Sequence, residues 1–251
     1  LDKGLNINNY DDLHNWSIKH KNEFWRNVWD FTNFVGEKKG KIFKSAPEFT
    51  KNKFFDECNI NYAENCLTRE DDDNSIIFHS EKKINRNYSW RELRSAVFKF
   101  ANYLKNNNIK KNDRIAAILP NIPETVISFL STAQLGAIWS SCSSDFGKKA
   151  IIDRFKQIEP KILIVSDHYF YNNKKIYTLK NIKSILTELP SIKNIIIIPF
   201  SNEQISIDEF EYTNWNEIIN QKDKYEVFER FVFNHPLYIL FSSGTTGEPK
   251  C

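Results

Sequence analysis

The sequence predicts an α/β fold with a mostly parallel sheet flanked by helices, preceded by a helical N-terminal extension. From residue 75 onward, short apolar runs alternate with amphipathic stretches of ten or more residues, which indicates strands joined by crossover helices. Hydrophobic residues make up 41% and aromatic residues 14% of the 251 residues, enough to bury a sizeable core. No uncharged apolar stretch approaches the roughly 18 residues of a membrane span. The net charge of +3 is too mild to indicate a nucleic-acid or membrane partner, and we expect neither.

The N-terminal extension is expected over residues 1–55, and the main domain over 56–251. Asp11 or Asp12 is expected to cap a first helix that ends near Lys19, and a second helix fits residues 22–34. We interpret the aromatic stripe of the second helix as a packing surface rather than a ligand site.

The main domain begins with a strand, and its first long helix has a recognisable start. Ser89 and Glu92 form a capping box, in which each side chain accepts a hydrogen bond from the other residue's backbone N–H. The strands are expected over 75–78, 114–119, 137–140, 162–165, 195–198 and 237–241, and two further helices over 121–135 and 148–158.

The cysteines and histidines do not have the spacing of a metal site. None of the four cysteines forms a C-x-x-C pair, and the five histidines do not cluster with them. We therefore expect no metal bound by these residues. Isolated cysteines suit a reducing compartment, so a cytoplasmic location is expected.

The densest motif lies at the end of the chain, where residues 238–250 read Y-I-L-F-S-S-G-T-T-G-E-P-K. An apolar strand is followed by hydroxyl side chains, two glycines and a lysine, which is the composition of a phosphate-binding loop. Glycines allow positive φ and close approach of the backbone to an anion, and successive N–H groups carry partial positive charge. The spacing differs from a Walker A loop, which has four residues between its glycines and a lysine directly after the second. A plain Ser/Thr/Gly surface loop is the alternative.

This motif resembles the phosphate-binding signature of the acyl-adenylate-forming superfamily, which includes acyl-CoA synthetases. Residues 61–65, N-Y-A-E-N, resemble an element of the acetyl- and acetoacetyl-CoA synthetases. Residues 135–147, L-G-A-I-W-S-S-C-S-S-D-F-G, resemble the acetoacetyl-CoA synthetase form of the next segment, as does the opening W-S-I-K-H-K-N-E-F-W-R-N-V-W. The resemblance covers nearly the whole chain and identifies residues 56–251 as a partial adenylation domain.

The resemblance implies an ATP-dependent ligase that joins acetoacetate to coenzyme A through an acyl-adenylate, giving acetoacetyl-CoA, with Mg²⁺ neutralising phosphate charge. It implies that the ATP phosphates are held by Ser242, Ser243, Gly244, Thr245, Thr246, Gly247, Glu248, Pro249 and Lys250. Lys174 matches the position of a basic residue that contacts coenzyme A phosphates, although the family has arginine there; a solvated surface lysine is the alternative. The hydroxyls of residues 140–144 line a coenzyme A or acyl channel, or else form a strand-end turn.

The chain lacks methionine and reaches Cys251 one residue after its main motif, so we expect it to be a piece of a longer protein. The family's adenine contacts, magnesium-linked glutamate and catalytic lysine lie downstream of this motif. We therefore expect no catalytic residue within the piece, no activity from it alone, and a partner in the rest of its own chain. The alternatives are an acetate or propionate ligase, a non-catalytic nucleotide-binding fragment, and a generic P-loop NTPase.

Overall fold

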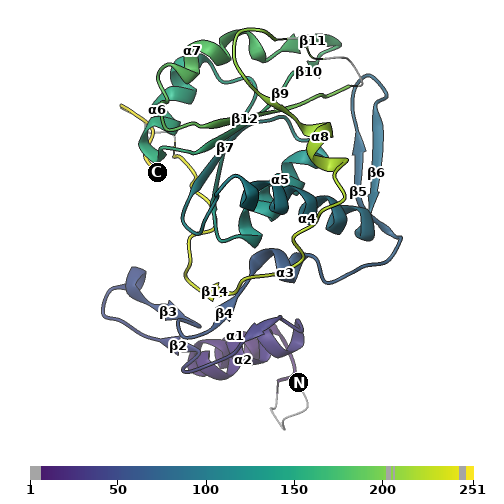
Figure 1. Ribbon diagram of the computed structural model, residues 1–251. Coiled ribbons are helices and arrows are strands. Elements are labelled where there is room, and N and C mark those ends of the chain that lie inside the picture. The colour runs from purple at the N-terminus through teal and green to yellow at the C-terminus, as the bar shows by residue number, and fades with distance from the viewer. Residues whose placement is uncertain (1–6, 202–204, 206, 243–246) are drawn as a thin grey trace. The chain divides into compact units, whose positions relative to one another are not determined.

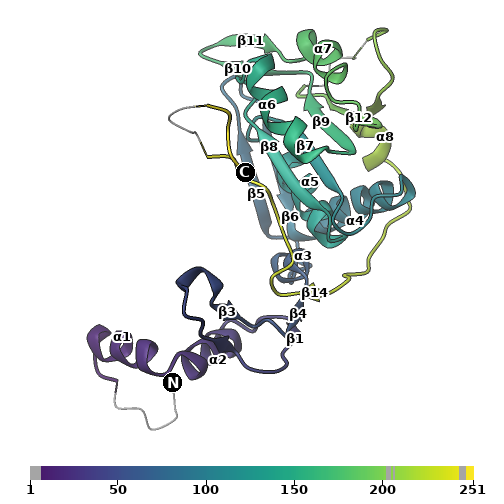
Figure 2. The same cartoon turned by 90° about the vertical axis from the view of Figure 1, so that its left-hand side faces the viewer.

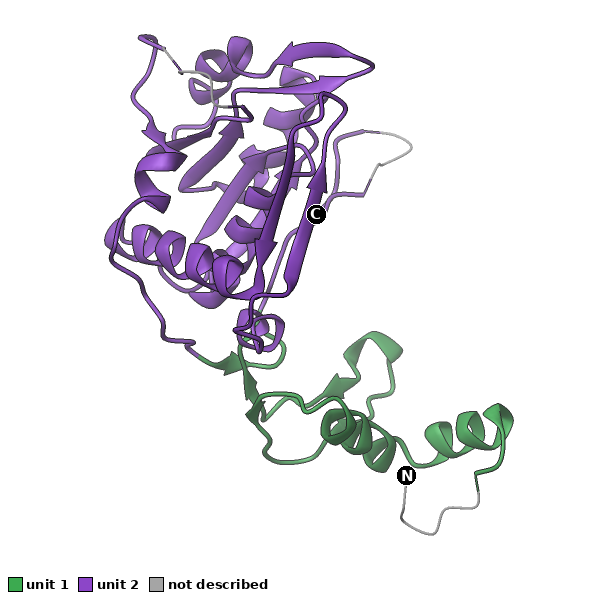
Figure 3. Ribbon diagram, turned by 90° about the vertical axis from the view of Figure 1, so that its right-hand side faces the viewer, with its two compact units in different colours: residues 1–61, 230–235 green, residues 62–229, 236–251 purple. Residues whose placement is uncertain are grey.

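The computed structural model describes residues 7–251 except for 202–204, 206 and 243–246. The chain divides into two compact units, drawn in different colours in Figure 3. Unit 1 consists of residues 1–61 and 230–235, and unit 2 of residues 62–229 and 236–251. The expected division between residues 55 and 56 stays a prediction about domains, and each unit is described by itself below.

Unit 1 begins with two helices, α1 (Tyr10–Lys19) and α2 (Lys21–Phe31). The expected aspartate cap of α1 is wrong, because the side chain of Asn9 accepts the hydrogen bond from the N–H of Asp12. Asp11 and Asp12 instead lie in the first turn, where their charge is favourable beside the positive end of the helix dipole. Helix α2 ends three residues earlier than expected, before Asn33 adopts a φ of 50°.

The remainder of unit 1 consists of short antiparallel strands. β4 (Asn59–Ile60) pairs on one side with β1 (Gly36–Glu37) and on the other with β14 (Phe231–Val232). β2 (Phe43–Lys44) and β3 (Lys53–Phe54) form a separate pair around the 3₁₀ turn η1 (Phe49–Lys51). The extension expected to be helical therefore also contains strands. The buried residues of its small core are Trp29, Ile42, Phe55 and Cys58.

Unit 2 is organised around a five-stranded parallel sheet with the order β13-β12-β9-β7-β8 (Figure 1). The strand bounds are β7 (Arg114–Ile118), β8 (Ile138–Cys142), β9 (Ile162–Ser166), β12 (Asn194–Ile198) and β13 (Thr213–Asn214). The predicted α/β class with a parallel sheet is confirmed. The apolar runs predicted over 114–119, 137–140, 162–165 and 195–198 are found in this sheet, whereas the run predicted over 75–78 lies in an antiparallel hairpin instead.

Helices cover both faces of this sheet. The long helices are α4 (Trp90–Asn106), α5 (Pro123–Gln134) and α6 (Lys148–Ile158), and the short ones are α3 (Tyr62–Cys66), η2 (Leu179–Asn181), α7 (Ile182–Leu186) and α8 (Trp215–Ile219). Ile115 and Ala117 of β7 belong to the core shared with α4 and α5, whereas Ala116 and Ile118 belong to the core shared with α6 and α7. This alternation explains the continuous apolar runs, because strands covered on both faces bury every side chain.

The capping box that begins α4 is confirmed. The N–H of Glu92 donates to Ser89 Oγ at 3.2 Å, and the N–H of Ser89 donates to Glu92 Oε2 at 2.8 Å. Two antiparallel hairpins complete unit 2: β5 (Asn74–His79) with β6 (Asn85–Ser89), and β10 (His168–Tyr171) with β11 (Lys174–Tyr177). Among the described residues, no helix has the length and apolar character needed to cross a membrane.

Candidate functional site

The segment of residues 237–241 positions the predicted phosphate loop at the sheet edge. It runs parallel to β8 through a single bridge between Trp139 and Tyr238. The N–H of Trp139 donates to the carbonyl of Leu237 at 3.1 Å, and the N–H of Ile239 donates to the carbonyl of Trp139 at 2.8 Å. Figure 2 shows this C-terminal segment in yellow. The full strand expected here is reduced to this bridge, because only one side of the segment pairs with a described strand.

A buried hydroxyl adds a third hydrogen bond to this attachment. Ser140 is 1% exposed, and its Oγ donates to the carbonyl of Ile239 at 3.0 Å. The hydroxyl of Ser140, one of the candidate channel-lining groups, therefore binds the segment of residues 237–241 to the sheet. Because the segment is parallel to β8, the residues after it leave at the carboxyl edge of the sheet, where parallel α/β sheets bind ligands.

The predicted phosphate loop closes on itself at that edge. The N–H of Ser242 donates to the carbonyl of Lys250 at 3.0 Å, and Ser242 Oγ lies 3.3 Å from the same oxygen. Ser243, Gly244, Thr245 and Thr246 lie outside the described residues. Gly247 has a φ of 106°, a conformation that side-chain-bearing residues rarely adopt. The motif therefore forms a loop closed at its base by Ser242 and Lys250.

The described part of the loop presents its charges to solvent. Glu248 and Lys250 are both exposed. Lys250 forms no ion pair with any residue whose position the structure describes, which leaves its ammonium group available to an anion. The carbonyl of Pro249 accepts a hydrogen bond from Gln157 Nε2 of α6 at 2.8 Å, which fixes the returning arm of the loop to that helix.

Helix α6 supports the loop and the end of β8. The guanidinium of Arg154 lies 4.8 Å from the ring centroid of Phe146 and 5.9 Å from that of Phe241. In the first turn, a hydrogen bond from Lys149 to Asp153 raises the pKa of the lysine. At the end of β8, burial raises the pKa of Cys142 to about 11. The thiol therefore stays protonated at neutral pH, as expected for a packing residue rather than a nucleophile.

Lys174 lies on a different structural element from the loop. It is the first residue of β11, directly after the turn formed by Asn172 and Asn173, and its side chain is exposed. No hydrogen bond or ion pair among the described residues joins it to Ser242 or to residues 247–250. The structure thus places the two predicted phosphate contacts on separate elements of unit 2.

Two buried polar groups in unit 2 were not anticipated from the sequence. At the end of β9, Asp167 Oδ1 accepts from the N–H groups of His168 at 2.7 Å and Phe200 at 2.8 Å, and it lies 2.9 Å from His168 Nδ1. Ser201 Oγ lies 3.4 Å from the Nε2 of this histidine. Polar residues directly after an apolar strand were the available signal, because such residues lie at the carboxyl edge of the sheet.

The second group is an ion pair between Arg86 of β6 and Glu124 in the first turn of α5. Glu124 is 3% exposed, and its Oε2 has no hydrogen-bond partner among the described residues. Burial and the Glu124 carboxylate together raise the pKa of Tyr88. No sequence signal links two residues so far apart in the chain, so the pair could not have been predicted.

The family profile described as AMP-binding enzyme matches residues 63–251. The chain belongs to this family. The match includes the whole predicted phosphate loop and Lys174.

Individual members of the AMP-binding family cover nearly the whole chain. Acetoacetyl-coenzyme A synthetase of Rhizobium meliloti (strain 1021) is 38% identical over 251 residues, which are 99% of this chain and 38% of the relative. Acetoacetyl-CoA synthetase of Xenopus tropicalis is 36% identical over 266 aligned positions, covering 99% of this chain and 39% of the relative. The structure titled Acetoacetyl-CoA Synthetase from Streptomyces lividans matches with a TM-score of 0.90 at 31% identity, covering 99% of this chain and 38% of that one. The chain thus spans about two fifths of the length of these AMP-binding relatives.

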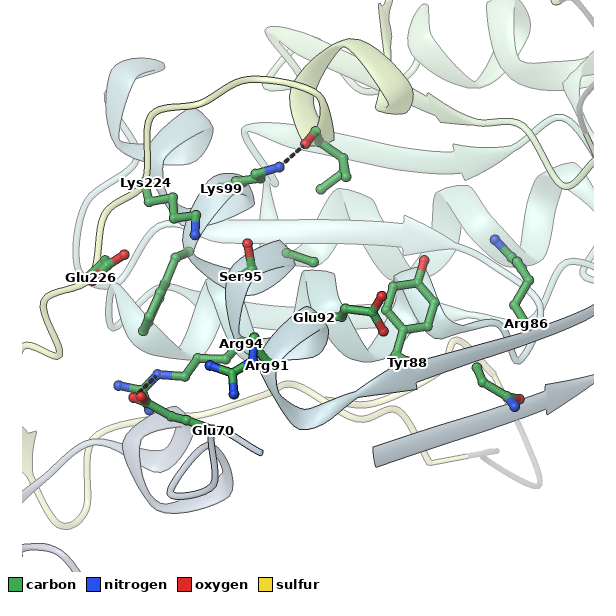
Figure 4. A pocket seen from close by; sticks show the side chains of 14 residues that line it. Glu70, Arg86, Tyr88, Arg91, Glu92, Arg94, Ser95, Lys99, Lys224 and Glu226 are labelled. Atoms are coloured by element: carbon green, nitrogen blue, oxygen red, sulfur yellow. Dashed lines mark hydrogen bonds and ion pairs between the residues drawn. The ribbon is translucent and has the colours of Figure 1, made fainter. Parts of the chain in front are cut away.

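A groove of about 720 Å³ lies along α4, away from the family's motif (Figure 4). Its lining contains none of the predicted site residues. Its cations are largely engaged, since Arg91 pairs with Asp72 and Arg94 with Glu70, each at 2.8 Å, and Lys99 donates to the carbonyl of Ile219 at 2.6 Å. We therefore assign the candidate site to the sheet edge and not to this groove.

The described residues of this AMP-binding chain do not form a metal site of their own. Within the part of the chain that the structure describes, no three histidine, cysteine, aspartate or glutamate side chains gather closely enough to hold an ion.

Proposed function

We propose that this chain is part of an ATP-dependent acid–thiol ligase that converts acetoacetate to acetoacetyl-CoA. The observation that carries the proposal is the closed Ser242–Lys250 loop at the carboxyl edge of a parallel sheet, in a chain of the AMP-binding family. The acid is proposed from the names of the relatives, and acetate or propionate is the alternative substrate. The cytoplasm is the proposed location, which the four free cysteines support.

The reaction has two steps in this proposal. The acid's carboxylate oxygen attacks the α-phosphorus of ATP and pyrophosphate leaves, giving an acyl-adenylate. The sulfur of the coenzyme A thiolate then attacks the acyl carbon, and AMP leaves with the bonding electron pair. Most of the protein's work in the first step is positioning and charge stabilisation, as in other phosphoryl chemistry.

The loop is proposed to hold the β- and γ-phosphates of ATP. The Lys250 ammonium supplies a positive charge, and the positive φ of Gly247 is typical of loops that bind an anion with backbone N–H groups. The residues proposed with them are Ser242, Ser243, Gly244, Thr245, Thr246, Glu248 and Pro249. Lys174 is proposed to contact a phosphate of coenzyme A. Magnesium is proposed to reach the site with ATP.

The experiment that tests this function is acid-dependent exchange of pyrophosphate into ATP, measured on the polypeptide as its gene encodes it. Acetoacetate is expected to support faster exchange than acetate or propionate. Lys250→Ala is expected to weaken ATP binding, whereas Lys180→Ala, which removes an exposed lysine elsewhere, is the matched control. ATP hydrolysis that needs no acid would instead favour an NTPase, and ATP binding without exchange would favour a non-catalytic nucleotide-binding protein.

The described residues alone are proposed not to complete the reaction. Tyr238 and Leu240 are 51% and 68% exposed beside β8, and the chain covers 38% of its Rhizobium relative. We propose that further polypeptide of the same protein covers these side chains and supplies the remaining catalytic groups. Acid-dependent AMP production by residues 1–251 alone would contradict this proposal.

A further inference from the structure

The turn that carries Lys174 holds a carboxylate from another part of unit 2. Asn172 and Asn173 connect β10 to β11 with φ values of 48° and 61°. A two-residue hairpin turn with both φ values positive directs the N–H groups of its central residues away from the ladder. The N–H of Asn172 donates to Glu81 Oε1 at 3.1 Å, and the N–H of Asn173 donates to Glu81 Oε2 at 2.8 Å.

Glu81 comes from the turn between β5 and β6, so the contact joins the tips of two hairpins (Figure 1). Both of its oxygens are used, one on each N–H group. This is the geometry by which successive backbone N–H groups bind an external anion. The turn therefore binds a carboxylate in the resting protein, and the carboxylate is the protein's own.

The charges around this contact favour an anion with more charge than one carboxylate. Lys174 and Lys175 directly follow the turn, and Lys82 and Lys83 directly follow Glu81. Glu81 forms no ion pair with Lys82, Lys83 or Lys174 in the described structure, and the Lys174 ammonium is exposed without an ion-pair partner there. Lys174, Lys82 and Lys83 thus stand against a single carboxylate.

The contact is also easily exchanged. Glu81, Asn172 and Asn173 are all exposed, so the carboxylate and the N–H groups are hydrated when they separate. Exposed charged contacts contribute little to stability because water competes for both partners. An incoming dianion therefore meets a weakly held competitor.

We propose that the Asn172–Asn173 turn is a phosphate subsite whose resting occupant is Glu81, and that a phosphate monoester of the ligand displaces this carboxylate. The inference rests on the proposed function, which takes Lys174 as a coenzyme A contact, and adds the backbone donors and the built-in competitor. No covalent bond changes. The phosphate oxygens accept the two N–H groups, Lys174 pairs with the phosphate, and the Glu81 side chain moves into solvent.

The effect of this competition on the apparent Kd depends on the fraction of time that Glu81 occupies the turn. If Glu81 holds the turn for about nine tenths of the time, only about one tenth of the molecules are competent, and the apparent Kd is raised about tenfold. Removing the carboxylate restores that factor, which corresponds to about 1.4 kcal/mol. Glu81→Gln keeps one acceptor oxygen without the charge and is expected to give an intermediate gain.

The experiment is isothermal titration of adenosine 3′,5′-bisphosphate into the polypeptide as its gene encodes it. Glu81→Ala is expected to bind about tenfold more tightly than the natural protein, and Lys174→Ala more weakly. Glu188→Ala is the matched control: the side chain of this exposed glutamate forms no hydrogen bond or ion pair with a described residue, and its loss changes the net charge equally.

Each pattern of results decides the inference. Tighter binding by Glu81→Ala together with weaker binding by Lys174→Ala supports both the subsite and the proposed coenzyme A contact. Weaker binding by Lys174→Ala with unchanged Glu81→Ala overturns the displacement and leaves the contact standing. Unchanged binding in both variants overturns both. Equal tightening in Glu81→Ala and Glu188→Ala overturns the inference, because net charge alone would then explain it.

Discussion

Replacing Ser140 with alanine tests whether one buried hydroxyl holds the phosphate loop's strand on the sheet. Three hydrogen bonds attach residues 237–239 to β8, and the Oγ of Ser140 supplies one of them, at 3.0 Å to the carbonyl of Ile239. The variant removes that bond and leaves the Ile239 carbonyl without this donor. A hydrogen bond of this kind contributes about 0.5–1.5 kcal/mol, and an orphaned buried acceptor costs about 1–3 kcal/mol.

Because Ile239 is only half-buried, water hydrates its carbonyl in part and reduces that cost. We expect the attachment of residues 237–239 to β8 to be weakened by about 1.4 kcal/mol, which is tenfold in the equilibrium constant for local opening. The loss is expected to be local, because the other two hydrogen bonds are backbone bonds that the substitution does not remove. The amide of Ile239, which donates to the carbonyl of Trp139 at 2.8 Å, is the reporter. Native-state hydrogen exchange is expected to be about tenfold faster at this amide, with unchanged rates in the centre of the sheet.

Ser128→Ala is the matched control. Ser128 is fully buried in α5, but its Oγ has no hydrogen-bond partner among the described residues, so its loss is expected to be neutral or stabilising. If the Ile239 amide exchanges at the natural rate in Ser140→Ala, the argument that this hydroxyl holds the segment is wrong. Equal effects of the two substitutions would point to a general loss of packing instead.

Three further substitutions follow from the structure. Glu124→Ala leaves Arg86 with its charge half-buried and unpaired, so urea unfolding is expected to show a loss of about 3 kcal/mol; a change below about 1 kcal/mol would contradict a strong pair. Gly247→Ala puts a side chain at a φ of 106° where its Cβ has no described atom within 4 Å, so backbone strain of about 1–3 kcal/mol is expected to weaken ATP binding; unchanged affinity in titration calorimetry would show that the loop does not need this conformation. Cys142 keeps its proton in the folded state up to about pH 11, against an ordinary pKa of 9.0, so unfolding free energy is expected to fall as pH rises between these values, and Cys142→Ala is expected to abolish that part of the fall.

The sheet and its long helices could be predicted because their signals are local. The side chains of Ser89 and Glu92 mark the start of α4 within four residues, and the apolar run that ends at Ile118 reports burial on both faces. The closed base of the phosphate loop also lies within one short segment, from Ser242 to Lys250. In each case the interacting residues are close in sequence, or the apolar character of one continuous run indicates the structure.

The parts that could not be predicted depend on partners far apart in the chain. β14 has two residues and no pattern of its own, and it is a strand only because it meets β4. The hairpin of β10 and β11 lacks alternation of polar and apolar residues, although its Asn-Asn turn tolerates positive φ and was a usable signal. The contact of Glu81 with that turn joins two loops, which no periodicity encodes.

The pairing of β14 with β4 has a consequence for the order in which the protein is made. Residues 62–229 emerge from the ribosome between the two stretches of unit 1, so its three-stranded sheet stays incomplete until residue 232 has been synthesised. Only a few residues later, Tyr238 reaches β8. A single short stretch therefore makes the described contacts of both units only after the long intervening segment has been synthesised, and closing these long loops has an entropic cost. A ribosome that stalls before this stretch leaves β4 without its β14 partner and β8 without the bridge to Tyr238.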